Sequence, residues 1–569
     1  MSAQLRPGMT PHGPSSGKAG MTHIVPGTPA DQTTRTRPAA KTFFRVFALL
    51  SGLMVLWALA TPLMAYPDEP VHTIKAAAVA RGQIAPEAGK SFGHGLHVQV
   101  PSYIANLQAQ TCFAFHRDRS AGCAPGVPAD DNYLTIGVTS AGLYNPMYYW
   151  LVGLPSLFMS GAPAVFAMRI LSALLSAAFY AAGFTALSRL RHPKWPMAAA
   201  AVATTPMVLF LASGINPNSL EVAATMAAFC GFLVVLENSS QLRVVRPAVI
   251  TVAVSIIALA NTRAVSLVWL LCAVVVACVF YRWKDFLVLF RNRVVLMAVG
   301  VAAVGVALGM AWNLLILNAP PSAGEAPPGI SNVTGDDVRP YNAFLTMLDR
   351  SFDYVIQYVG VVGWLDTPMP QAVLMFWNML LMLAILMVFL VRHWRLRLGF
   401  LAALAALLLV PSVMQAGLVA SVGFIWQGRY SLPLFLIAVI AAGMAFRFRH
   451  FPQSRPSQAM TRLLLLAGAI AHVYGFLFVL RRYVVGLPDK GNWQTMITVP
   501  GWQPPFTWEV LTLVYAVTVL IGAGMLFGYL HPGGTLLSMP GSLARLSFRQ
   551  KGPQSANGQA VARADSTKP

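Results

Sequence analysis

Long apolar runs dominate this chain and are separated by shorter polar segments. A helix needs about 20 apolar residues to cross the roughly 30 Å hydrocarbon core of a bilayer. The first such run covers residues 43–65. Eleven more follow, near 163–188, 197–213, 218–236, 246–261, 264–281, 294–317, 372–391, 398–422, 429–446, 460–480 and 508–530. The pattern predicts an all-α polytopic membrane protein with about 12 crossings, within a range of 11–13.

A shorter apolar stretch at 144–159 does not fit this series. It has only about 15 residues, and Pro146 and Pro155 interrupt it. Four aromatic residues gather in its first half: Tyr144, Tyr148, Tyr149 and Trp150. Counting this stretch as a crossing would invert every later loop. We therefore predict a re-entrant or interfacial helix.

The polar segments define the predicted domain organisation. Residues 1–42 are rich in Gly, Pro, Ser and Thr and predict a disordered basic cytoplasmic tail, and 531–569 predict a second disordered cytoplasmic tail. The region between them, 43–530, is the predicted multi-pass domain. With twelve crossings, three long segments fall on the extracytoplasmic side: 66–143, 318–371 and 481–507.

The charge distribution supports this topology. Of 569 residues, 56% are hydrophobic and 10% charged, and the formal net charge is +21. In a soluble protein that excess would suggest a nucleic-acid partner. Here 27 of the 40 Lys and Arg residues, but only 4 of the 19 acids, fall in the predicted cytoplasmic segments. Such a bias orients membrane helices, so we expect both termini in the cytoplasm and no nucleic-acid binding.

The five cysteines divide between the membrane and the first outer loop. Cys230, Cys272 and Cys278 lie in predicted membrane helices, where they serve most simply as small apolar residues. Cys112 and Cys123 lie in the loop 66–143. That compartment permits disulfides, so the two form a candidate bridge. The spacing of Cys and His does not resemble a zinc site anywhere in the chain.

A cluster of polar residues follows the first membrane helix on its outer side. It reads Tyr66-Pro67-Asp68-Glu69-Pro70-Val71-His72. If residues 69–80 are helical, Asp68 and His72 lie about one turn apart and can converge on one substrate hydroxyl or one cation. The alternative is structural, with Asp68 as a helix N-cap and Pro70 in the first turn.

A second group of polar residues lies at the outer ends of later membrane helices. A charge at bilayer depth costs a few kcal/mol, so these residues are expected to line a cavity or pair with each other. Arginine can grip a phosphate bidentately, although an interfacial arginine can also simply snorkel. The group comprises Asn216, Asn218, Glu221, Asn261, Arg263, Gln427, Arg429 and Tyr430.

A third group lies in the large outer loop, in Gly363-Trp364-Leu365-Asp366-Thr367-Pro368. Trp364 is either an interface anchor or a platform on which a sugar stacks. Asp366 before Thr-Pro is a favourable turn residue, and that role alone would explain it.

Five spaced motifs together resemble a known family. They are Asp-Glu-Pro-Val-His at 68–72, Tyr-Asn-Pro-Met-Tyr-Tyr at 144–149, Ile-Asn-Pro-Asn-Ser-Leu-Glu at 215–221, Gly-Trp-Leu-Asp at 363–366 and Gln-Gly-Arg-Tyr-Ser-Leu-Pro at 427–433. The ordered set resembles a bacterial membrane-protein family, domain-of-unknown-function family 2142, over roughly residues 45–450. That family is grouped with the GT-C type glycosyltransferases.

The resemblance implies roles for single residues. Asp68 would be the base that deprotonates an acceptor hydroxyl, with Glu69 and His72 orienting it or holding a divalent cation. Arg429 and Arg263 would bind the phosphate of a lipid-linked leaving group. The remaining candidates on the substrate side are Tyr430, Gln427, Asn216, Asn218, Glu221, Trp364 and Asp366.

Two motifs depart from the family pattern. The family often has Asp where this chain has Asn218, and a His-Pro-Pro sequence where it has Tyr144-Asn145-Pro146. The first departure weakens a metal or second-base role at position 218, and the second weakens acceptor positioning by the 144–146 loop.

The resemblance also implies a reaction and a compartment. A sugar would pass from a polyprenyl-phosphate donor to an envelope glycan or glycolipid acceptor, on the extracytoplasmic face of a bacterial cytoplasmic membrane. Two alternatives stay open. One is a transporter or flippase of a lipid-linked saccharide, and the other is a polymer ligase or non-catalytic envelope-assembly protein.

Overall fold

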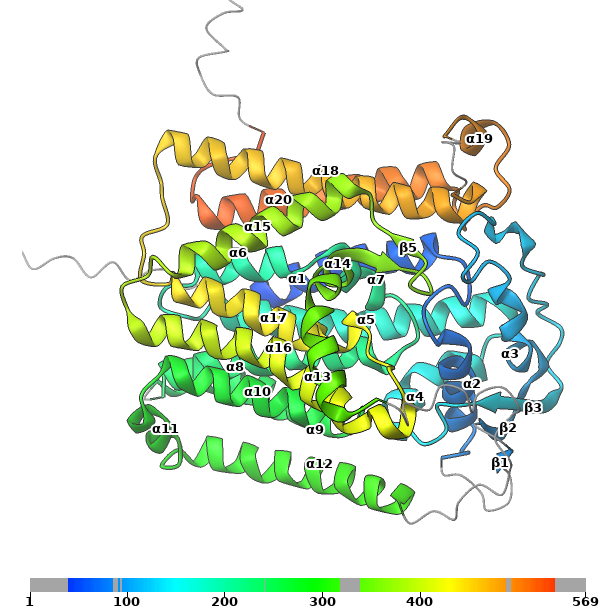
Figure 1. Cartoon of the computed structure of the whole chain (residues 1–569), viewed down its shortest axis with the longest axis horizontal. Coiled ribbons are helices and arrows are strands. Elements are labelled where there is room, and N and C mark those ends of the chain that lie inside the picture. Colours follow the sequence, from blue (N-terminus) through cyan, green and yellow to red (C-terminus); the bar gives the residue numbers. More distant parts are fainter. Residues whose placement is uncertain are drawn as a thin grey trace, which may run out of the picture.

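Long helices lying side by side form the body of the molecule (Figure 1). The computed structural model describes residues 39–84, 91–92, 95–239, 241–317, 338–487 and 493–537. Nine helices in these ranges are long and apolar enough to cross a membrane: α1 (Ala39–Ala60), α5 (Gly161–Leu187), α8 (Pro217–Glu237), α12 (Arg293–Leu317), α15 (Gln371–Val388), α16 (Trp394–Val422), α17 (Gly428–Ala445), α18 (Arg455–Val485) and α20 (Trp508–Leu530). The predicted helical multi-pass membrane fold is confirmed.

The other three predicted crossings are less regular. Apolar helices α9 (Leu242–Ala260) and α10 (Ser266–Phe280) occupy two of them. The run predicted at 197–213 is broken into α6 (Lys194–Ala203) and α7 (Pro206–Leu211). Proline lacks an N–H and favours the first turn of a helix, and the Thr205 hydroxyl caps α7 by accepting from Val208 N at 3.3 Å. The expected count of twelve continuous crossings is therefore not established.

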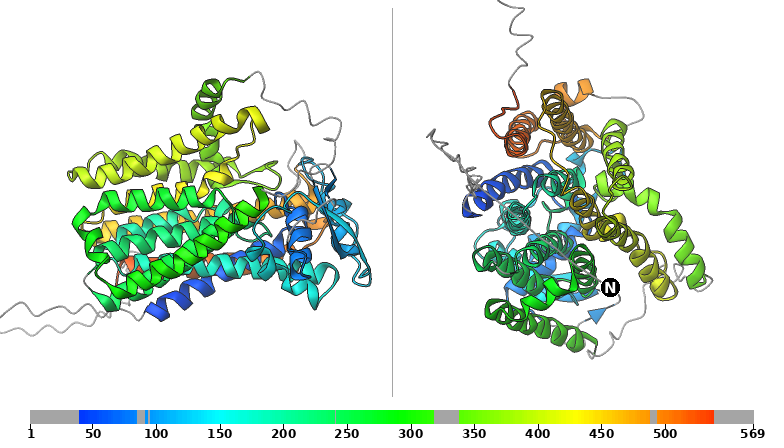
Figure 2. Two further views of the ribbon diagram at one scale, coloured as in Figure 1. Left: turned by 90° about the horizontal axis from the view of Figure 1, so that it is seen from below. Right: turned by 90° about the vertical axis from the view of Figure 1, so that its left-hand side faces the viewer.

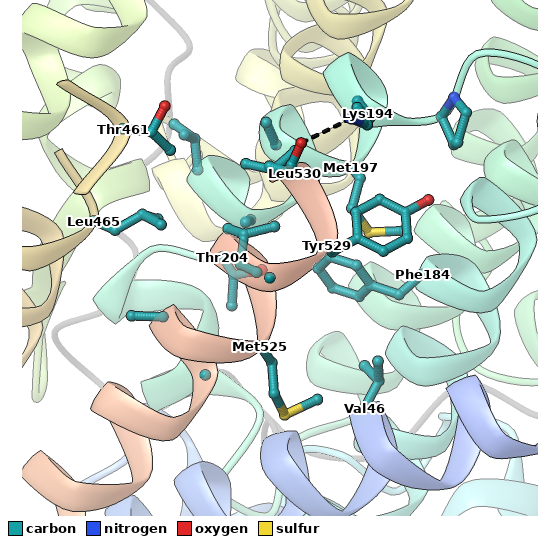
Figure 3. A pocket seen from close by; sticks show the side chains of 18 of the residues that line it. Val46, Phe184, Lys194, Met197, Thr204, Thr461, Leu465, Met525, Tyr529 and Leu530 are labelled. Atoms are coloured by element: carbon teal, nitrogen blue, oxygen red, sulfur yellow. Dashed lines mark hydrogen bonds between the residues drawn. The ribbon is translucent and has the colours of Figure 1, made fainter. Parts of the chain in front are cut away.

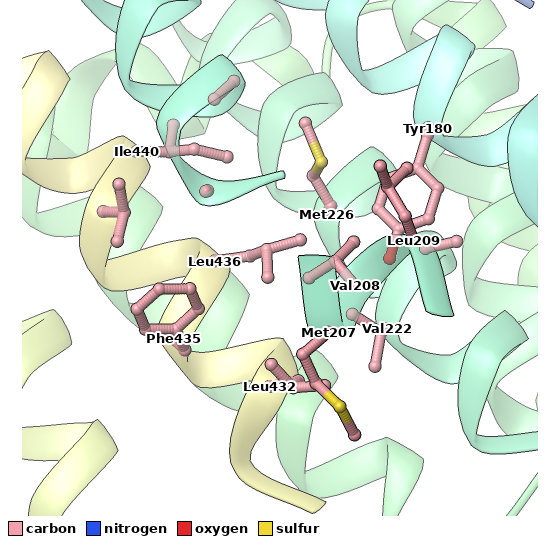
Figure 4. Close-up of a cluster of buried hydrophobic side chains, with 14 of the residues drawn as sticks. Tyr180, Met207, Val208, Leu209, Val222, Met226, Leu432, Phe435, Leu436 and Ile440 are labelled. Carbon is pink, nitrogen blue, oxygen red and sulfur yellow. The ribbon is translucent and has the colours of Figure 1, made fainter. Parts of the chain in front are cut away.

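Helices α8 and α17 form the interior of the bundle. Both are apolar on all sides and are enclosed by their neighbours over most of their length. Side chains from α7, α8 and α17 interlock between them (Figure 4), among them Met207, Val208, Leu209, Val222, Met226, Leu432, Phe435, Leu436 and Ile440. Because the candidate residues at 216–221 and 427–430 stand at the start of α8 and α17, a rigid core supports them.

The polar segments build a layer at one end of the bundle, which we call the outer end (Figure 1, right). Its helices are α2 (Glu69–Ala80), α3 (Ser102–Ala105) and α19 (Trp493–Thr498), whereas α13 (Pro340–Asp349) and α14 (Ser351–Gly360) lie nearer the middle of Figure 1, beside the long helices. An antiparallel sheet in the order β1 (Ser91–Phe92), β2 (Gly95–Pro101), β3 (Leu134–Thr139) lies below α2, and a small ribbon joins β4 (Val361–Val362) to β5 (Thr367–Pro368). The hydrophobic pattern had not indicated these strands.

Arg482, at the end of α18, ties the three predicted outer segments together. Its guanidinium donates to the carbonyls of Arg119 and Phe113 at 2.6 and 2.7 Å. It also contacts Asp366 Oδ2 at 3.3 Å. Parts of all three segments, around Phe113, Asp366 and Arg482, therefore pack together at this end. The disulfide between Cys112 and Cys123 lies in this layer, with the two Cα atoms 6.1 Å apart.

The stretch 144–159 forms the short helix α4 (Pro146–Gly153) and the 3-10 turn η3 (Leu154–Leu157), not a long helix. It packs on α2, where a Cβ at Gly153 would collide with the carbonyl oxygen of Ala76. Glycine is thus required for this close approach. The short length agrees with the expected re-entrant or interfacial segment, while its depth in a bilayer stays a prediction.

The opposite end, which we call the inner end, carries the short connections between long helices, including α11 (Trp283–Leu289). Figure 2 shows this division in its left panel, and its right panel looks onto the inner end. The predicted tails 1–42 and 531–569 fall almost wholly outside the described residues. The described residues within these ranges are 39–42, which belong to α1, and 531–537, which follow α20.

The orientation of the two ends can be tested by cysteine labelling. We expect a membrane-impermeant maleimide, added from outside, to label Asp130→Cys at the outer end but not Ser454→Cys at the inner end; both positions are exposed. Wild-type protein gives the background from native cysteines. Labelling of the second variant and not the first would invert the predicted topology.

Candidate functional site

Asp68 lies where α1 gives way to α2, and its carboxylate points toward α17. Its backbone adopts the left-handed conformation, with φ 60° and ψ 11°, and its side chain makes no capping hydrogen bond. Instead Oδ2 accepts from Arg429 Nη2 at 2.6 Å. The Asp68 side chain is 45% exposed, whereas that of Arg429 is 3% exposed. Asp68 thus occupies the N-cap position but does not act as an N-cap.

Glu69, the neighbouring carboxylate, faces a different partner. Arg169 of α5 binds it bidentately, with Nε–Oε1 and Nη2–Oε2 distances of 2.7 and 2.6 Å, and both side chains are fully buried. The same guanidinium also binds the backbone carbonyls of Ala58, Thr61 and Pro62 at 2.6–3.1 Å. Because the last carbonyls of a helix lack intrahelical donors, Arg169 satisfies the end of α1 and fixes the turn that leads to Asp68.

His72 is buried against α4. Its Nδ1 lies 2.8 Å from the hydroxyl of Tyr149. Burial lowers the pKa of His72 to about 3; the Asp68 carboxylate opposes this shift, and Arg429 and Arg263 reinforce it. The imidazole is therefore neutral at physiological pH and is a weak proton acceptor. This geometry favours a positioning role over proton transfer.

The three residues of the 68–72 cluster do not converge on one point. Asp68 pairs with Arg429, Glu69 with Arg169, and His72 with Tyr149. Among the described residues, His, Cys, Asp and Glu side chains form no group of three that could hold a metal ion. In this arrangement the cluster does not fit the expected cation site, and a divalent cation stays an untested expectation.

Arg429 and Arg263 flank one aromatic ring. Their guanidinium carbons lie 5.1 and 5.2 Å from the ring centroid of Tyr430. Two buried donors of Arg429, Nε and Nη1, have no hydrogen-bond partner within the described part of the chain, nor has the buried Oε1 of Gln427. A buried charged donor without a partner is costly. The site therefore offers unsatisfied cationic N–H groups next to a half-exposed carboxylate.

Glu221 holds the second arginine. Its fully buried carboxylate contacts Arg263 Nη1 at 3.2 Å. Its other partners are Asn218 Nδ2 at 2.8 Å and the hydroxyl of Ser266 at 2.6 Å. Arg263, 17% exposed, is thus a paired residue lining the site, and not an isolated snorkelling arginine.

Asparagines hold the surrounding loops. Asn216 donates from Nδ2 to the carbonyl of Pro67 at 3.1 Å, while its Oδ1 caps α8 by accepting from Asn218 N at 3.0 Å. Asn145 donates to Asn261 Oδ1 at 3.2 Å. The predicted polar residues of the second group thus meet the 66–72 turn at the outer end, as an assembly that positions Asp68.

Trp364 and Asp366 lie beside this assembly, and their side chains form hydrogen bonds with the backbone of Met64 and Phe115. Trp364 Nε1 donates to the carbonyl of Met64 at 3.0 Å, and its partly exposed ring lies 5.7 Å from that of Phe115. Asp366 accepts from the backbone N of Phe115 at 3.0 Å and pairs with Arg482. Asp366 therefore has a loop-fixing role, while the Trp364 ring keeps an accessible face.

Several residues that shape the site escaped sequence reasoning. The sequence did contain a signal for Arg169, because a lone arginine in an apolar run usually faces a buried partner. It also contained a signal for Arg482, because this arginine lies in a predicted outer segment, against the positive-inside pattern. Ser266 and Gln357, whose Oε1 accepts from Gly428 N at 2.6 Å, carry no such signal. Tyr149 lay in a predicted motif, but its contact with His72 was not expected.

Residues 50–438 match the family model described as "Predicted membrane protein (DUF2142)". The chain belongs to this family. No curated protein matches the chain.

Two solved structures resemble this DUF2142 chain. One is ArnT from Cupriavidus metallidurans in the apo state, with 13% identity, a TM-score of 0.43, and coverage of 87% of this chain and 78% of that one. The other is the same protein bound to undecaprenyl phosphate, with 13% identity, a TM-score of 0.44, and coverage of 86% of this chain and 78% of that one. Similarity at this level does not assign an activity to the chain.

The Glu69–Arg169 pair yields a stability prediction. Glu69→Gln or Arg169→Met alone leaves a buried group without its partner, so each is expected to lower the free energy of unfolding by about 3–5 kcal/mol. The double variant should lose less than the sum of the two. Equilibrium unfolding in mixed micelles measures this, with the exposed Arg395→Gln as control. Additive losses would contradict a direct coupling.

Burial of His72 yields a pH prediction. Because its pKa falls from 6.5 to about 3 on folding, the neutral residue stabilises the fold fully above pH 6.5, and this contribution is lost as the pH falls from 6.5 toward 3. Between pH 7.5 and 5 the loss is about 2 kcal/mol. We expect His72→Gln to be less acid-sensitive than wild type by that amount, in unfolding measured at both pH values. The exposed His116→Gln is the control, and an unchanged pH dependence of His72→Gln would refute the assignment.

Proposed function

We propose that this protein is an integral-membrane glycosyltransferase of the GT-C type. It transfers a hexosyl or pentosyl group from a polyprenyl-phosphate donor to an envelope glycan or glycolipid acceptor, on the extracytoplasmic face. The observation that carries the proposal is the half-exposed Asp68 carboxylate beside Arg429, whose remaining donors Nε and Nη1 are unsatisfied. The ordered family motifs at the same place support it.

Asp68 acts as the general base in this proposal. Oδ2 is held by Arg429, and Oδ1 is left for the acceptor. As the acceptor oxygen attacks the anomeric carbon of the donor, its proton passes to Asp68, a new C–O bond forms, and the bond from the anomeric carbon to the phosphate oxygen breaks. A base within hydrogen-bond reach of the hydroxyl is the requirement for such a step.

The arginines stabilise the departing phosphate. The leaving polyprenyl phosphate gains negative charge as the bond breaks, and cationic donors fixed in advance stabilise it most. Arg429 supplies Nε and Nη1, while Arg263, held by Glu221, supplies a second cation across the ring of Tyr430. The fixed positions of both groups reduce the reorganisation that the reaction requires.

The membrane setting suits a lipid-linked donor. A polyprenyl phosphate keeps its anionic head at the interface and its tail in hydrocarbon, and the cationic groups of the site lie at the ends of membrane helices. Asp68 immediately follows the outer end of α1, where an acceptor arriving from the aqueous side can meet the donor.

Asp68→Asn tests the base. We expect sugar transfer in reconstituted membranes, measured with a panel of hexosyl and pentosyl polyprenyl phosphates, to fall about 10²- to 10⁴-fold because the amide cannot accept the proton. Asp130→Asn, which changes an exposed carboxylate at the same end, should keep wild-type transfer. Unchanged transfer by Asp68→Asn would show that Asp68 is not the base. Donor translocation without transfer by the wild type would favour the transporter instead.

Arg429→Gln tests the phosphate site. Losing charge-assisted hydrogen bonds worth about 1.5–3 kcal/mol should weaken transfer about 10- to 100-fold. We expect the loss in kcat/KM for the donor, while kcat/KM for the acceptor measured at saturating donor changes less. Arg117→Gln, exposed at the outer end, is the control. A loss confined to kcat/KM for the acceptor would contradict the assignment of Arg429 to the phosphate site.

A further inference from the structure

A large cavity lies at the inner end, away from the candidate site. It has a volume of about 1670 Å³ and is bounded by α1, α6, α15, α18 and α20 (Figure 3). On α1 it extends from Thr42 to Leu53, whereas Asp68 follows the other end of that helix. At 1.5 Å per residue, the lining residues on α1 lie from about 27 Å (Thr42) to about 10 Å (Leu53) before the end of the helix. None of the residues of the candidate site lines the cavity.

The walls of this inner cavity are mainly apolar. Side chains from all five helices line it, among them Leu50, Leu53, Met197, Phe376, Leu465, Ala469 and Val519. Its volume exceeds the 300–1,000 Å³ that is usual for small-molecule pockets. Because four of these helices, α1, α15, α18 and α20, are long and apolar enough to span a membrane, hydrocarbon chains are the ligand groups that match these walls.

The rim of the cavity is basic. Arg45, Arg189, Arg191 and Lys194 line it, and none of its lining residues is acidic. Lys194 Nζ donates to the carbonyl of Leu530 at 2.8 Å, which leaves two of its three donors. Arg45, Arg189 and Lys194 form no ion pair with a carboxylate within the described ranges. Arg191 lies beside Glu237, whose Oε2 accepts from Arg191 N at 3.0 Å and whose carboxylate also pairs with Arg447. The rim thus carries a net positive charge.

We propose that this inner cavity binds an anionic phospholipid, with the phosphate on the basic rim and the acyl chains along the apolar walls. Basic pockets between membrane helices on the cytoplasmic side suit anionic headgroups, and this end is the one that the charge bias predicts to be cytoplasmic. A groove of about 590 Å³ between α1 and α20 shares Arg45, Leu49 and Met525 with the cavity. It gives the lipid a route from the surrounding bilayer.

Native mass spectrometry of the full-length protein in micelles tests the proposal. The protein is titrated with phosphatidylglycerol, with zwitterionic phosphatidylethanolamine, and with polyprenyl phosphate. We expect phosphatidylglycerol to bind with an apparent Kd at least tenfold below that of phosphatidylethanolamine. Equal affinity for the two phospholipids, or tighter binding of polyprenyl phosphate that displaces phosphatidylglycerol, would overturn the proposal.

Two glycines on α20 allow the cavity to be filled. A Cβ at Gly524 or Gly528 would meet nothing within 4 Å, and both residues line the cavity. We expect Gly524→Leu/Gly528→Leu to weaken phosphatidylglycerol binding at least tenfold. Gly300→Leu on α12, where a Cβ is equally unobstructed but the cavity is distant, should bind as wild type. Wild-type affinity in the double variant would place the lipid elsewhere.

The headgroup is tested separately. Arg45→Gln/Arg189→Gln should remove most of the preference for phosphatidylglycerol over phosphatidylethanolamine, while Arg395→Gln/Arg397→Gln, which removes the same charge from α16 outside the cavity, should keep it. Thermal unfolding of all variants checks that they fold. A preference that survives in the first pair, or disappears equally in both, would contradict recognition by the rim.

Discussion

The fully buried ion pair between Glu69 and Arg169 fixes the turn on which the candidate site depends. Two charges removed from water are favourable only when their partners and hydrogen bonds are complete. Arg169 meets this condition by binding both oxygens of Glu69 and three carbonyls at the end of α1. With the turn held, Asp68 can adopt a left-handed backbone that directs its side chain away from α2 and toward Arg429.

From Asp68 the polar groups continue across the bundle through Arg429, Tyr430 and Arg263 to Glu221. Apart from Asp68, which precedes α2, these groups stand on the first turns of α8 and α17 or between α9 and α10, and α8 and α17 are packed on all sides. The turns of the candidate site therefore rest on the most completely buried of the candidate membrane helices. At the inner end the opposite holds, since α1, α18 and α20 leave a cavity between them.

The sequence allowed the helical membrane fold and the main charged groups to be predicted, because spanning helices have a characteristic length and intramembrane charges are rare. Asp68, Arg429, Arg263 and Glu221 do lie together. Glu69 was expected to act together with Asp68 because the two are adjacent in the sequence. It faces away from Asp68 instead, because successive residues at a helix start point in different directions. The break before Pro206 was hidden within an apolar run, and the partner of His72, Tyr149, could not be found without tertiary contacts.

The sequence separation of the Asp68–Arg429 contact has a consequence for biosynthesis. The two residues are 361 positions apart, and Arg482, which binds Phe113 from 369 positions away, comes later still. Membrane insertion proceeds from the amino terminus, so the carboxylate reaches its compartment well before either arginine is synthesised. Until α17 has been inserted, Asp68 stands without its cationic partner. A prematurely terminated chain could bury Glu69 against Arg169 and yet possess no assembled site.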